Sequence, residues 1–239
     1  MILQRLPFRA ASAAENMAAD FLLLKRHPDK AAARFRHYGW RGDCLTFGYA
    51  QKIAWVRDQL PPDAARPDLC RRPTGGGLVD HRADWTYALV IPRGHELCEA
   101  PAPESYRAVH EAVAATLNTL GHRVVLKPRP DLPSETSAKS AAPSVCFKRP
   151  EIFDVVHPAS GEKVAGAAQK RAKEGLLFQG SIWKPSVPGT DWDAFAGLFA
   201  NALASTLAAG LRDVPWPDND DELAALSEHY ASPEWNEAR

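Results

Sequence analysis

The sequence predicts an α+β protein with a mixed β-sheet and flanking helices. Apolar residues make up 45% of the 239 residues and charged residues 24%, as in an ordinary globular domain. Stretches with the two-residue alternation of strands occur among stretches with the apolar spacing of helices. No internal repeat appears and no linker divides the chain. We therefore expect a single domain over residues 1–239, whose C-terminal portion, 190–239, is largely helical.

The N-terminal half is expected to contain two helices and several strands. Ser12 and Glu15 have the spacing of a capping box, and apolar residues at helical spacing follow them, which predicts a helix over 13–26. A second apolar stripe predicts a helix over 103–120, with Gly121 as its C-cap. The predicted strands cover 35–40, 43–47, 85–91 and 124–126, and the proline-rich stretch 57–69 is expected to be a loop.

The C-terminal half begins with a proline-rich irregular segment, residues 128–150, and segments of this kind usually carry function or are disordered. Strands are predicted at 152–156, 162–168 and 176–183, with a hairpin turn at 158–161. Helices are predicted at 191–210 and 220–230, before a tail that contains Trp235.

Composition and spacing argue against several functional classes. The chain carries 29 basic and 29 acidic side chains, so a nucleic-acid or membrane-surface partner is not expected. No apolar run approaches the roughly 18 residues that span a bilayer, and residues 1–14 lack the apolar core of a secretory signal. The four cysteines are widely spaced and the histidines lack ligand spacing, so we expect a reduced, cytoplasmic protein without a bound metal.

The segment 71–77, Arg-Arg-Pro-Thr-Gly-Gly-Gly, is the first candidate for a binding site. Three consecutive glycines are costly to order, but they are useful where the backbone must approach a ligand closely. Their N–H groups can line an anion or a carbonyl, and the two arginines add positive charge. A flexible turn between strands is the alternative interpretation. The candidate substrate-binding residues here are Arg71, Arg72, Thr74, Gly75, Gly76 and Gly77.

Two of the predicted strands are rich in glycine and other small residues. Glycine within a strand often marks the close approach of a ligand, so we expect the three glycine-containing segments to form one surface for a long, slim molecule. Lys163 opens the first of these strands and is a candidate catalytic residue; the alternative is a solvated lysine at a strand start. The candidate substrate-binding residues on these strands are Gly166, Ala167, Gln169, Gly180 and Ser181.

Cys146 is the candidate nucleophile among the four cysteines. It ends the proline-rich segment near Lys139, Lys148 and Arg149, and a positive neighbourhood makes the reactive thiolate available. The alternative is that Cys146, like most single cysteines, is an inert small hydrophobic residue.

In their order along the chain, these segments resemble the motifs of the lipoate–protein ligase and octanoyltransferase family. Residues 71–81 resemble its RRxTGG or RRxSGGG motif with a following histidine, which adds His81 to the candidate substrate-binding residues. Residues 163–171 resemble K-[IV]-x-G-x-A-Q-x-R, and residues 176–182 resemble L-L-x-[HQ]-G-[ST]-[IL]. Further similarities are N-M-A-x-D at 16–20, E-S-Y-R at 104–107, C-F at 146–147 and the closing tail at 234–236.

The resemblance implies the fold of biotin/lipoate–protein ligase catalytic domains and a tunnel for an eight-carbon acyl chain. The C-F and E-S-Y-R segments favour the cysteine-dependent octanoyltransferases, which take octanoyl from acyl-carrier protein through a cysteine thioester, here on Cys146. Lys163 would stabilise the reacting carbonyl. The implied acceptors are lipoyl domains of 2-oxoacid dehydrogenases or the glycine cleavage H protein, and no permanently bound cofactor is expected.

Two alternatives stay open. Gly77 completes a ligase-like triple glycine, as in an ATP-dependent lipoate–protein ligase that forms lipoyl-AMP. In such a ligase Gly75–Gly77 and Arg72 would hold the adenylate phosphate, and Cys146 would be incidental. A non-catalytic acyl-binding module would keep the tunnel but show no turnover.

Overall fold

The computed structural model describes residues 1–26, 31–60, 67–129, 150–217 and 220–238. The strands of the large sheet are β1 (Ile2–Arg5), β2 (Arg9–Ala11), β3 (Ala32–Trp40), β7 (Asp84–Pro92), β8 (Val125–Leu126), β9 (Val155–Val156), β10 (Lys163–Arg171), β11 (Gly175–Trp183) and β12 (Gly210–Asp213). A small second sheet consists of β4 (Cys44–Phe47), β5 (Asp68–Arg71) and β6 (Leu78–Asp80). The helices are α1 (Ala13–Lys25), α2 (Ile53–Asp58), α3 (Glu96–Glu99), α4 (Ala102–Thr119), α5 (Trp192–Thr206), α6 (Asp220–Ala231) and α7 (Pro233–Asn236), with a 3-10 turn η1 at Lys184–Ser186.

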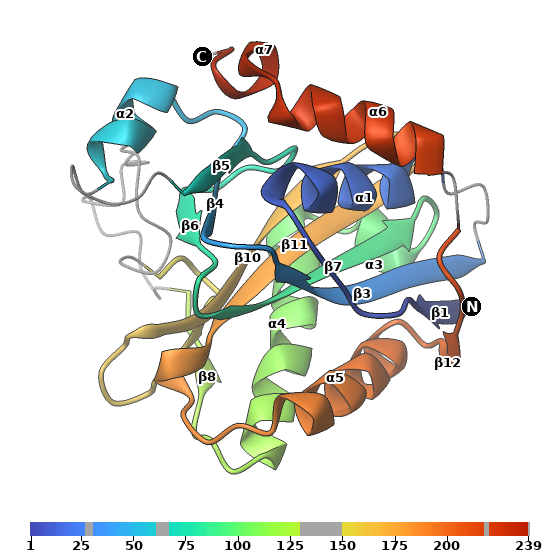
Figure 1. The fold of residues 1–239 in the computed structure, drawn as a ribbon. Coiled ribbons are helices and arrows are strands. Elements are labelled where there is room, and N and C mark those ends of the chain that lie inside the picture. The colour runs from blue at the N-terminus through green and yellow to red at the C-terminus, as the bar shows by residue number, and fades with distance from the viewer. Residues whose placement is uncertain (27–30, 61–66, 130–149, 218–219, 239) are drawn as a thin grey trace.

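The large sheet is mixed, in the order β12-β1-β3-β7-β11-β10-β9-β8, with β2 beside β3. The pairs β12–β1, β1–β3 and β2–β3 are parallel, and the pairs from β3 onward to β8 are antiparallel. Helices α4 and α5 cover one face, while α1 and α6 lie on the other (Figure 1). This architecture confirms the predicted α+β class.

The main hydrophobic core fills the space between the sheet and helices α4 and α5. Tyr87 of β7, Phe178 of β11 and Phe199 of α5 are fully buried there. β7 is buried along its whole length because helices cover both faces of the sheet at this strand. The opposite face of β7 and β11, toward α1, is therefore the surface on which a ligand pocket can form.

Several elements agree with the sequence-based expectations. α1 begins with the predicted capping box, in which Glu15 N–H donates to Ser12 Oγ at 3.3 Å and Ser12 N–H donates to the Glu15 carboxylate at 2.8 Å. Gly121 follows α4 with a φ of +91°, the left-handed conformation that favours glycine after a helix. Helix α6 and the strands β3, β4, β7, β8, β10 and β11 also lie where they were predicted.

Other expectations were wrong in part. The loop predicted over 57–69 is shorter, because α2 extends to Asp58 and β5 begins at Asp68. The strand predicted over 152–156 is reduced to Val155–Val156, because Phe153 has a φ of +68°, which no strand can contain. The helix predicted over 191–210 ends at Thr206, and an unexpected strand, β12, follows it.

The other unexpected elements are short and give little sequence signal: β1, β2, β6, α2, α3, α7 and η1. Most of the proline-rich segment lies outside the described residues. Across the described parts of the chain, no helix is long and apolar enough to cross a membrane.

Candidate active site

A slot-shaped pocket lies between the α1 face of the large sheet and the small sheet, with about 470 Å³ of empty space including its open mouth. Four of its lining residues form one row across adjacent strands, since Tyr38 pairs with Thr86, Thr86 with Ser181, and Ser181 with Gly166. Neighbouring strands are about 4.8 Å apart, so this row extends about 14 Å. The predicted residues that line the pocket are Arg72, Gly76, His81, Lys163, Gly166, Ala167, Gly180 and Ser181.

The guanidinium of Arg72 fixes the shape of the glycine segment. It is buried and donates to the carbonyl oxygens of Gly75 at 2.8 Å and Gly77 at 2.9 Å. It also donates to the carbonyl and the hydroxyl of Thr46, each at 2.9 Å. Gly76 has a φ of +89°, a conformation that glycine adopts without strain. Gly75 and Gly77 thus contribute backbone carbonyls to the turn, and of the three glycines only Gly76 lines the pocket.

Gly48 supports the same segment and was missed by the sequence analysis. A Cβ at Gly48 would lie 2.0 Å from the carbonyl oxygen of Gly76, so only glycine allows the two segments to pack this closely. Gly48 N–H donates to Gly77 at 3.2 Å and Tyr49 N–H donates to Thr74 at 2.8 Å. The only sequence signal was a single glycine at the end of a predicted strand.

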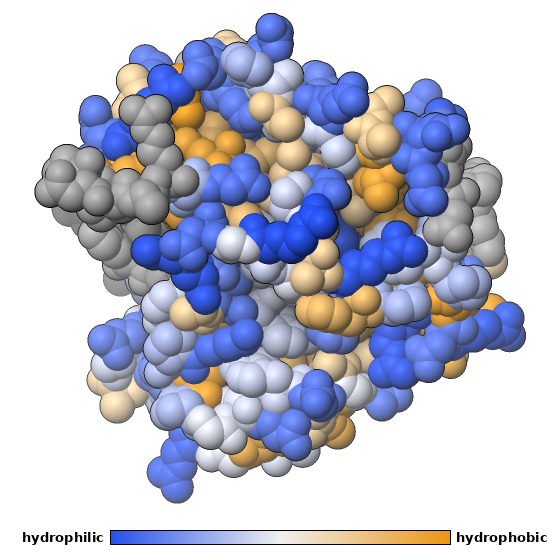
Figure 2. Space-filling view, viewed as in Figure 1, coloured by the Kyte–Doolittle hydropathy of each residue, from blue (hydrophilic) through white to orange (hydrophobic). Residues whose placement is uncertain are grey.

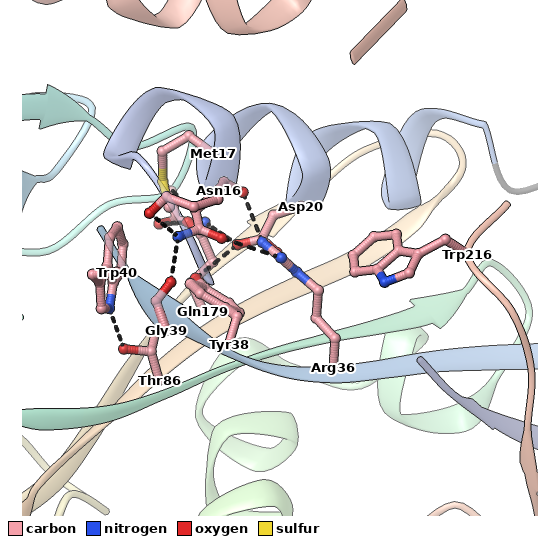
Figure 3. Close-up of polar contacts among 12 residues, drawn as sticks. Asn16, Met17, Asp20, Arg36, Tyr38, Gly39, Trp40, Thr86, Gln179 and Trp216 are labelled. Atoms are coloured by element: carbon pink, nitrogen blue, oxygen red, sulfur yellow. Dashed lines mark hydrogen bonds and ion pairs between the residues drawn. The ribbon is translucent and has the colours of Figure 1, made fainter. Parts of the chain in front are cut away.

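Thr74 lies behind the pocket wall, where it joins a buried network that the sequence analysis also missed. Its hydroxyl donates to Gln179 Oε1 at 2.7 Å, and Gln179 Nε2 donates to Asp20 Oδ2 at 2.7 Å. Asp20 pairs with Arg36 at 2.6 Å, and the Tyr38 hydroxyl donates to Asp20 at 3.0 Å (Figure 3). The network connects α1, β3, β11 and the glycine segment, so it holds these parts of the pocket together.

His81 belongs to a second hydrogen-bonded group, at the β3 side of the pocket. Its ring stacks on Trp40, with 3.9 Å between ring centroids, and its Nε2 lies 2.7 Å from Thr46 Oγ1. Its Nδ1 lies 2.7 Å from Asp84 Oδ2, which also accepts from the hydroxyl of Ser181. His81 thus lies between Asp84 and Thr46, and the Thr46 hydroxyl also accepts from Arg72, which joins this group to the glycine segment.

Lys163 lines the pocket beside Gly166 and is paired with a buried carboxylate. Its Nζ lies 2.8 Å from Asp154 Oδ2, and the two side chains are 5% and 0% exposed. A Cβ on Gly166 would lie 2.4 Å from both Cε and Nζ of Lys163, so this glycine makes room for the ammonium group. The interpretation of Lys163 as a solvated lysine is therefore wrong. Asp154 was not a predicted site residue, because nothing in its local sequence identifies the partner of Lys163.

Three predicted residues have contacts unlike those that were expected. Arg71 donates to the carbonyls of Tyr49, Gln51, Trp235 and Asn236, so it anchors the C-terminal tail and does not line the pocket. Gln169 Nε2 donates to the Ala102 carbonyl at 2.8 Å, which joins β10 to the start of α4. Gly180 lines the pocket through its backbone, but a Cβ there would lie 2.1 Å from the Tyr87 ring, so the core also requires glycine.

Cys146 lies outside the described residues. The three described cysteines are buried, and none lines the pocket. Burial raises the pKa of Cys44 to about 11 and raises the pKa of Cys70 and of Cys98 above the ordinary value. These three thiols are therefore in the protonated, unreactive form at neutral pH. No group of three or more metal-ligating side chains occurs within the described ranges.

Residues 12–196 match the family model described as the lipoyl protein ligase A/B catalytic domain. The chain belongs to this family, which confirms the resemblance found in the sequence. It is 36% identical to octanoyltransferase LipM of Bacillus subtilis over 174 residues, which are 72% of this chain and 62% of that protein. A similar match, 34% identical over 174 residues, is to octanoyltransferase LipM of Kyrpidia tusciae. The chain thus spans about 62% of the length of the curated relatives that it matches.

The fold is shared with solved lipoate–protein ligases. A T. acidophilum protein described as a lipoate protein ligase, solved with bound lipoic acid, superposes with a TM-score of 0.73 at 17% identity, over 100% of both chains. A bipartite lipoate protein ligase from Thermoplasma acidophilum, described together with its E2 lipoyl domain, gives 0.70 at 17% identity, over 99% of this chain and 96% of that one. These likenesses confirm the predicted lipoate–protein ligase catalytic-domain fold.

Proposed function

We propose that the protein is a cytoplasmic octanoyltransferase. It would take an octanoyl group from acyl-carrier protein, hold it as a thioester on Cys146, and transfer it to the lysine of a lipoyl domain or of the glycine cleavage H protein. Similarity to octanoyltransferase LipM supports the acyl group and the reaction class. The single observation that carries the proposal is the slot-shaped pocket with the buried Lys163 ammonium in its wall.

The dimensions of the pocket suit a medium-length acyl chain. An extended chain advances about 1.2 Å per bond, so eight carbons need about 8–9 Å, and the row from Tyr38 to Gly166 extends about 14 Å. Three of the four residues in the row, Thr86, Ser181 and Gly166, are small, which suits a slim chain lying along it. Burying the alkyl part would contribute up to about 5–6 kcal/mol, at about 0.8 kcal/mol per CH₂.

Lys163 is suited to stabilise the negative charge that develops on a thioester carbonyl oxygen. Its ammonium lies at the β10 end of the row, beside Gly166, in a site almost without water. A fixed positive charge stabilises an oxyanion far more strongly in such a site than in solution. The carbonyl would therefore lie at the β10 end of the slot, with the alkyl chain extending toward Tyr38.

Cys146 would be the nucleophile, and the surroundings of the three described cysteines support this choice. Cys44, Cys70 and Cys98 are buried away from the pocket with raised pKa values, which removes them as candidates. Cys146 precedes Glu151 by five residues, a distance of at most about 18 Å in an extended chain. Glu151 N–H and Lys163 Nζ bond to the same oxygen of Asp154, so the chain is long enough for Cys146 to reach the lysine end of the pocket.

The reaction would proceed in two acyl transfers. The Cys146 thiolate attacks the carbonyl carbon of the donor thioester, and the bond to the carrier sulfur breaks, releasing the carrier thiolate, which takes up the proton that the Cys146 thiol lost. The neutral amine of the acceptor lysine then attacks the Cys146 thioester. An amide bond forms, the carbon–sulfur bond breaks, and the proton lost by the amine returns the cysteine to its thiol form. Lys163 would stabilise the oxyanion in both transfers.

The ATP-dependent ligase is the second candidate, and the triple glycine is the observation that favours it. In that mechanism Arg72 would hold a phosphate. The donors of Arg72 named above instead go to three carbonyl oxygens and a hydroxyl of its own chain, which argues against that role.

Intact-mass spectrometry with octanoyl-carrier protein, without ATP or acceptor, tests the proposal. The wild-type protein should gain one octanoyl group, and hydroxylamine should release it, as it releases a thioester. Cys146→Ala should neither gain the group nor transfer it to a lipoyl domain. Cys98→Ala, which changes a buried cysteine outside the pocket, should behave as wild type.

The two alternatives predict different results in the same assay. A ligase would modify the lipoyl domain only with ATP and free lipoate, and Cys146→Ala would keep full activity. A non-catalytic binding module would bind an octanoyl or lipoyl compound without modifying the acceptor under either condition. Either result would refute the transferase proposal.

A further inference from the structure

The carboxylate of Asp154 is the centre of a buried hydrogen-bonded cluster next to the pocket. Asp154 has no solvent exposure and follows Phe153, whose left-handed backbone (φ +68°) turns the chain just before β9. One carboxylate oxygen accepts from Lys163 Nζ at 2.8 Å and from Glu151 N–H at 2.6 Å. The other oxygen accepts from the hydroxyl of Tyr106 at 2.5 Å. The orientation of this carboxylate therefore depends on donors from three separate segments.

Tyr106 connects this carboxylate to the pocket strand. It lies on the first turns of α4, and its oxygen accepts from the backbone N–H of Ala167 on β10 at 3.0 Å. Ala167 lines the pocket, whereas Tyr106 does not. Burial and the charge of Asp154 raise the pKa of the Tyr106 phenol well above its usual value, so the hydroxyl stays protonated and acts as a donor.

We propose that Tyr106 is a positioning residue, which holds the Asp154 carboxylate in the orientation that keeps the Lys163 ammonium at the pocket wall. In the contacts described above, Tyr106 touches neither the pocket nor Lys163, so it would act through Asp154. Its consequence for catalysis rests on the proposed function, but the position of Lys163 can be measured without any turnover.

The geometry explains why one hydroxyl can matter. Lys163 has a flexible side chain that ends in a compact charge, and only its partners determine where that charge lies. Its Cε and Nζ fill the space left by the missing Cβ of Gly166, so the ammonium is closely confined. Without the Tyr106 hydroxyl, Asp154 loses a donor in a dry site and can rotate toward another, and the ammonium shifts with it. A displacement of about 1 Å can lower the rate about 10²-fold.

Tyr106→Phe is the test, and Tyr87→Phe is its matched control. Tyr87 is fully buried, whereas Tyr106 is partly buried, and both are within the electrostatic influence of Asp154, but the Tyr87 hydroxyl has no hydrogen-bond partner among the described residues. Both substitutions remove one phenol oxygen and keep the ring. If packing alone matters, the two variants should behave alike.

The first measurement is the rate at which Lys163 is modified by an amine reagent such as acetic anhydride, followed by peptide mass spectrometry on the intact, folded chain. We expect Lys163 in Tyr106→Phe to react at least several-fold faster than in wild type, because a displaced ammonium is less protected. Lys163 in Tyr87→Phe should react at the wild-type rate. Equal rates in wild type and Tyr106→Phe would overturn the proposal.

The second measurement is octanoyl transfer. Tyr106→Phe should lower kcat about 10–100-fold with KM for the octanoyl donor nearly unchanged, because the carboxylate is misplaced and the pocket is intact. In an Asp154→Asn background the same substitution should have no further effect, since residues that act in series are not additive. If the losses of rate from Tyr106→Phe and Asp154→Asn were additive, Tyr106 would not act through Asp154. If the wild type shows no transfer while the Lys163 reaction rates differ as expected, the proposed function fails and the positioning role stands.

Discussion

Within the described residues, two buried ion pairs have an arginine or lysine of the large sheet as their cation, Arg36–Asp20 and Lys163–Asp154, and only the second contributes to the pocket wall. Arg36 lies 2.6 Å from Asp20, with side chains 2% and 0% exposed, so the two pairs are equally dry. The pocket lining includes Lys163 but neither member of the arginine pair. Burial of a charge therefore does not by itself identify a catalytic group.

The two pairs differ in how their cations are held. Arg36 also donates to the Asn16 carbonyl at 2.8 Å, and its guanidinium lies 3.9 Å from the Tyr38 ring centroid, between α1 and β3 (Figure 3). A guanidinium has five donors in a fixed plane and remains charged, which suits a permanent connection. The lysine ammonium is a compact charge on a flexible stem, so its position depends on its partner Asp154 and on the space beside Gly166. The arginine pair thus connects α1 to β3, and the lysine pair places a confined charge at the pocket wall.

The surface of the molecule differs in character from these buried charged groups. Hydrophilic residues dominate the face shown, and hydrophobic residues appear between them in small areas (Figure 2). The charges that matter to the site lie beneath this surface, so the predictions below concern buried groups, each compared with a control.

The largest expected effect is on stability, from Arg36→Met. This change leaves Asp20 buried without its cation, and removing one member of a buried pair costs about 3–5 kcal/mol of the free energy of unfolding. Chemical denaturation measures the loss. The matched control is Arg5→Met, which breaks the exposed pair with Asp213 and should cost at most about 1 kcal/mol. Equal losses of unfolding free energy in the two variants would show that the Asp20 carboxylate does not depend on Arg36 for its stabilisation.

Lys163→Met should reduce both activity and stability. Octanoyl transfer should fall about 10²–10³-fold, as is usual when one oxyanion stabiliser is removed. The fold should also be destabilised, because Asp154 is buried and would lose its cation. Adding Asp154→Asn should recover stability but not activity, which separates the two roles. Transfer within a few-fold of wild type would leave Lys163 with a structural role only.

Gly166→Ala should lower activity by displacing Lys163. The new Cβ would lie 2.4 Å from Lys163 Nζ and 2.9 Å from Asp154 Oδ1, so the paired side chains must shift and some stability should be lost as well. We expect transfer to fall about 10–100-fold, since the ammonium is displaced by about 1 Å or more. Gly197→Ala in α5 is the control, because its Cβ meets open space and alanine favours a helix by about 0.5–1 kcal/mol. Unchanged transfer in Gly166→Ala would show that the position of Lys163 is not critical.

Much of this architecture was predictable because its signals are local. The capping box of α1, the alternation of β7 and the helical stripe of α4 all depend on residues close together in the sequence. The glycine segment and the small-residue strands also predicted that a pocket exists, since glycines are costly unless a close contact requires them. Short elements such as β1 and β12 escaped prediction because their pairing partners, and not their own residues, determine them.

The networks could not be predicted, because they join residues that are distant in sequence. Thr74 and Gln179 are 105 positions apart, and Tyr106 and Asp154 are 48 apart. A sequence pattern shows a polar residue in each segment but not which one it meets. For the same reason Arg71 was interpreted as a ligand-binding residue, although its partners are carbonyls of the C-terminal tail and of residues 49 and 51. The role of Cys146 remains a prediction, since it lies outside the described residues.

The smallest expected effect is a dependence of stability on pH through His110, which lies beside the lysine pair. Burial lowers the pKa of His110 to about 4, from an ordinary value of 6.5, and its Nδ1–H donates to the Phe153 carbonyl at 2.7 Å, next to Asp154. In the unfolded chain His110 binds a proton at about pH 6.5, while in the folded protein it stays neutral down to about pH 4. As the pH falls from about 6.5 toward 4, protonation of His110 stabilises the unfolded chain but not the folded protein. The free energy of unfolding should therefore decrease by roughly 1–3 kcal/mol.

Denaturation at pH 7 and pH 5 would measure this loss, and His110→Gln should remove most of it, because glutamine can still donate to Phe153 but does not titrate. The comparison variant is His37→Gln, since partial burial also lowers the pKa of His37, and that variant should remove a smaller part of the loss. If stability were equally sensitive to pH in wild type and in His110→Gln, His110 would not be the group that titrates in this window.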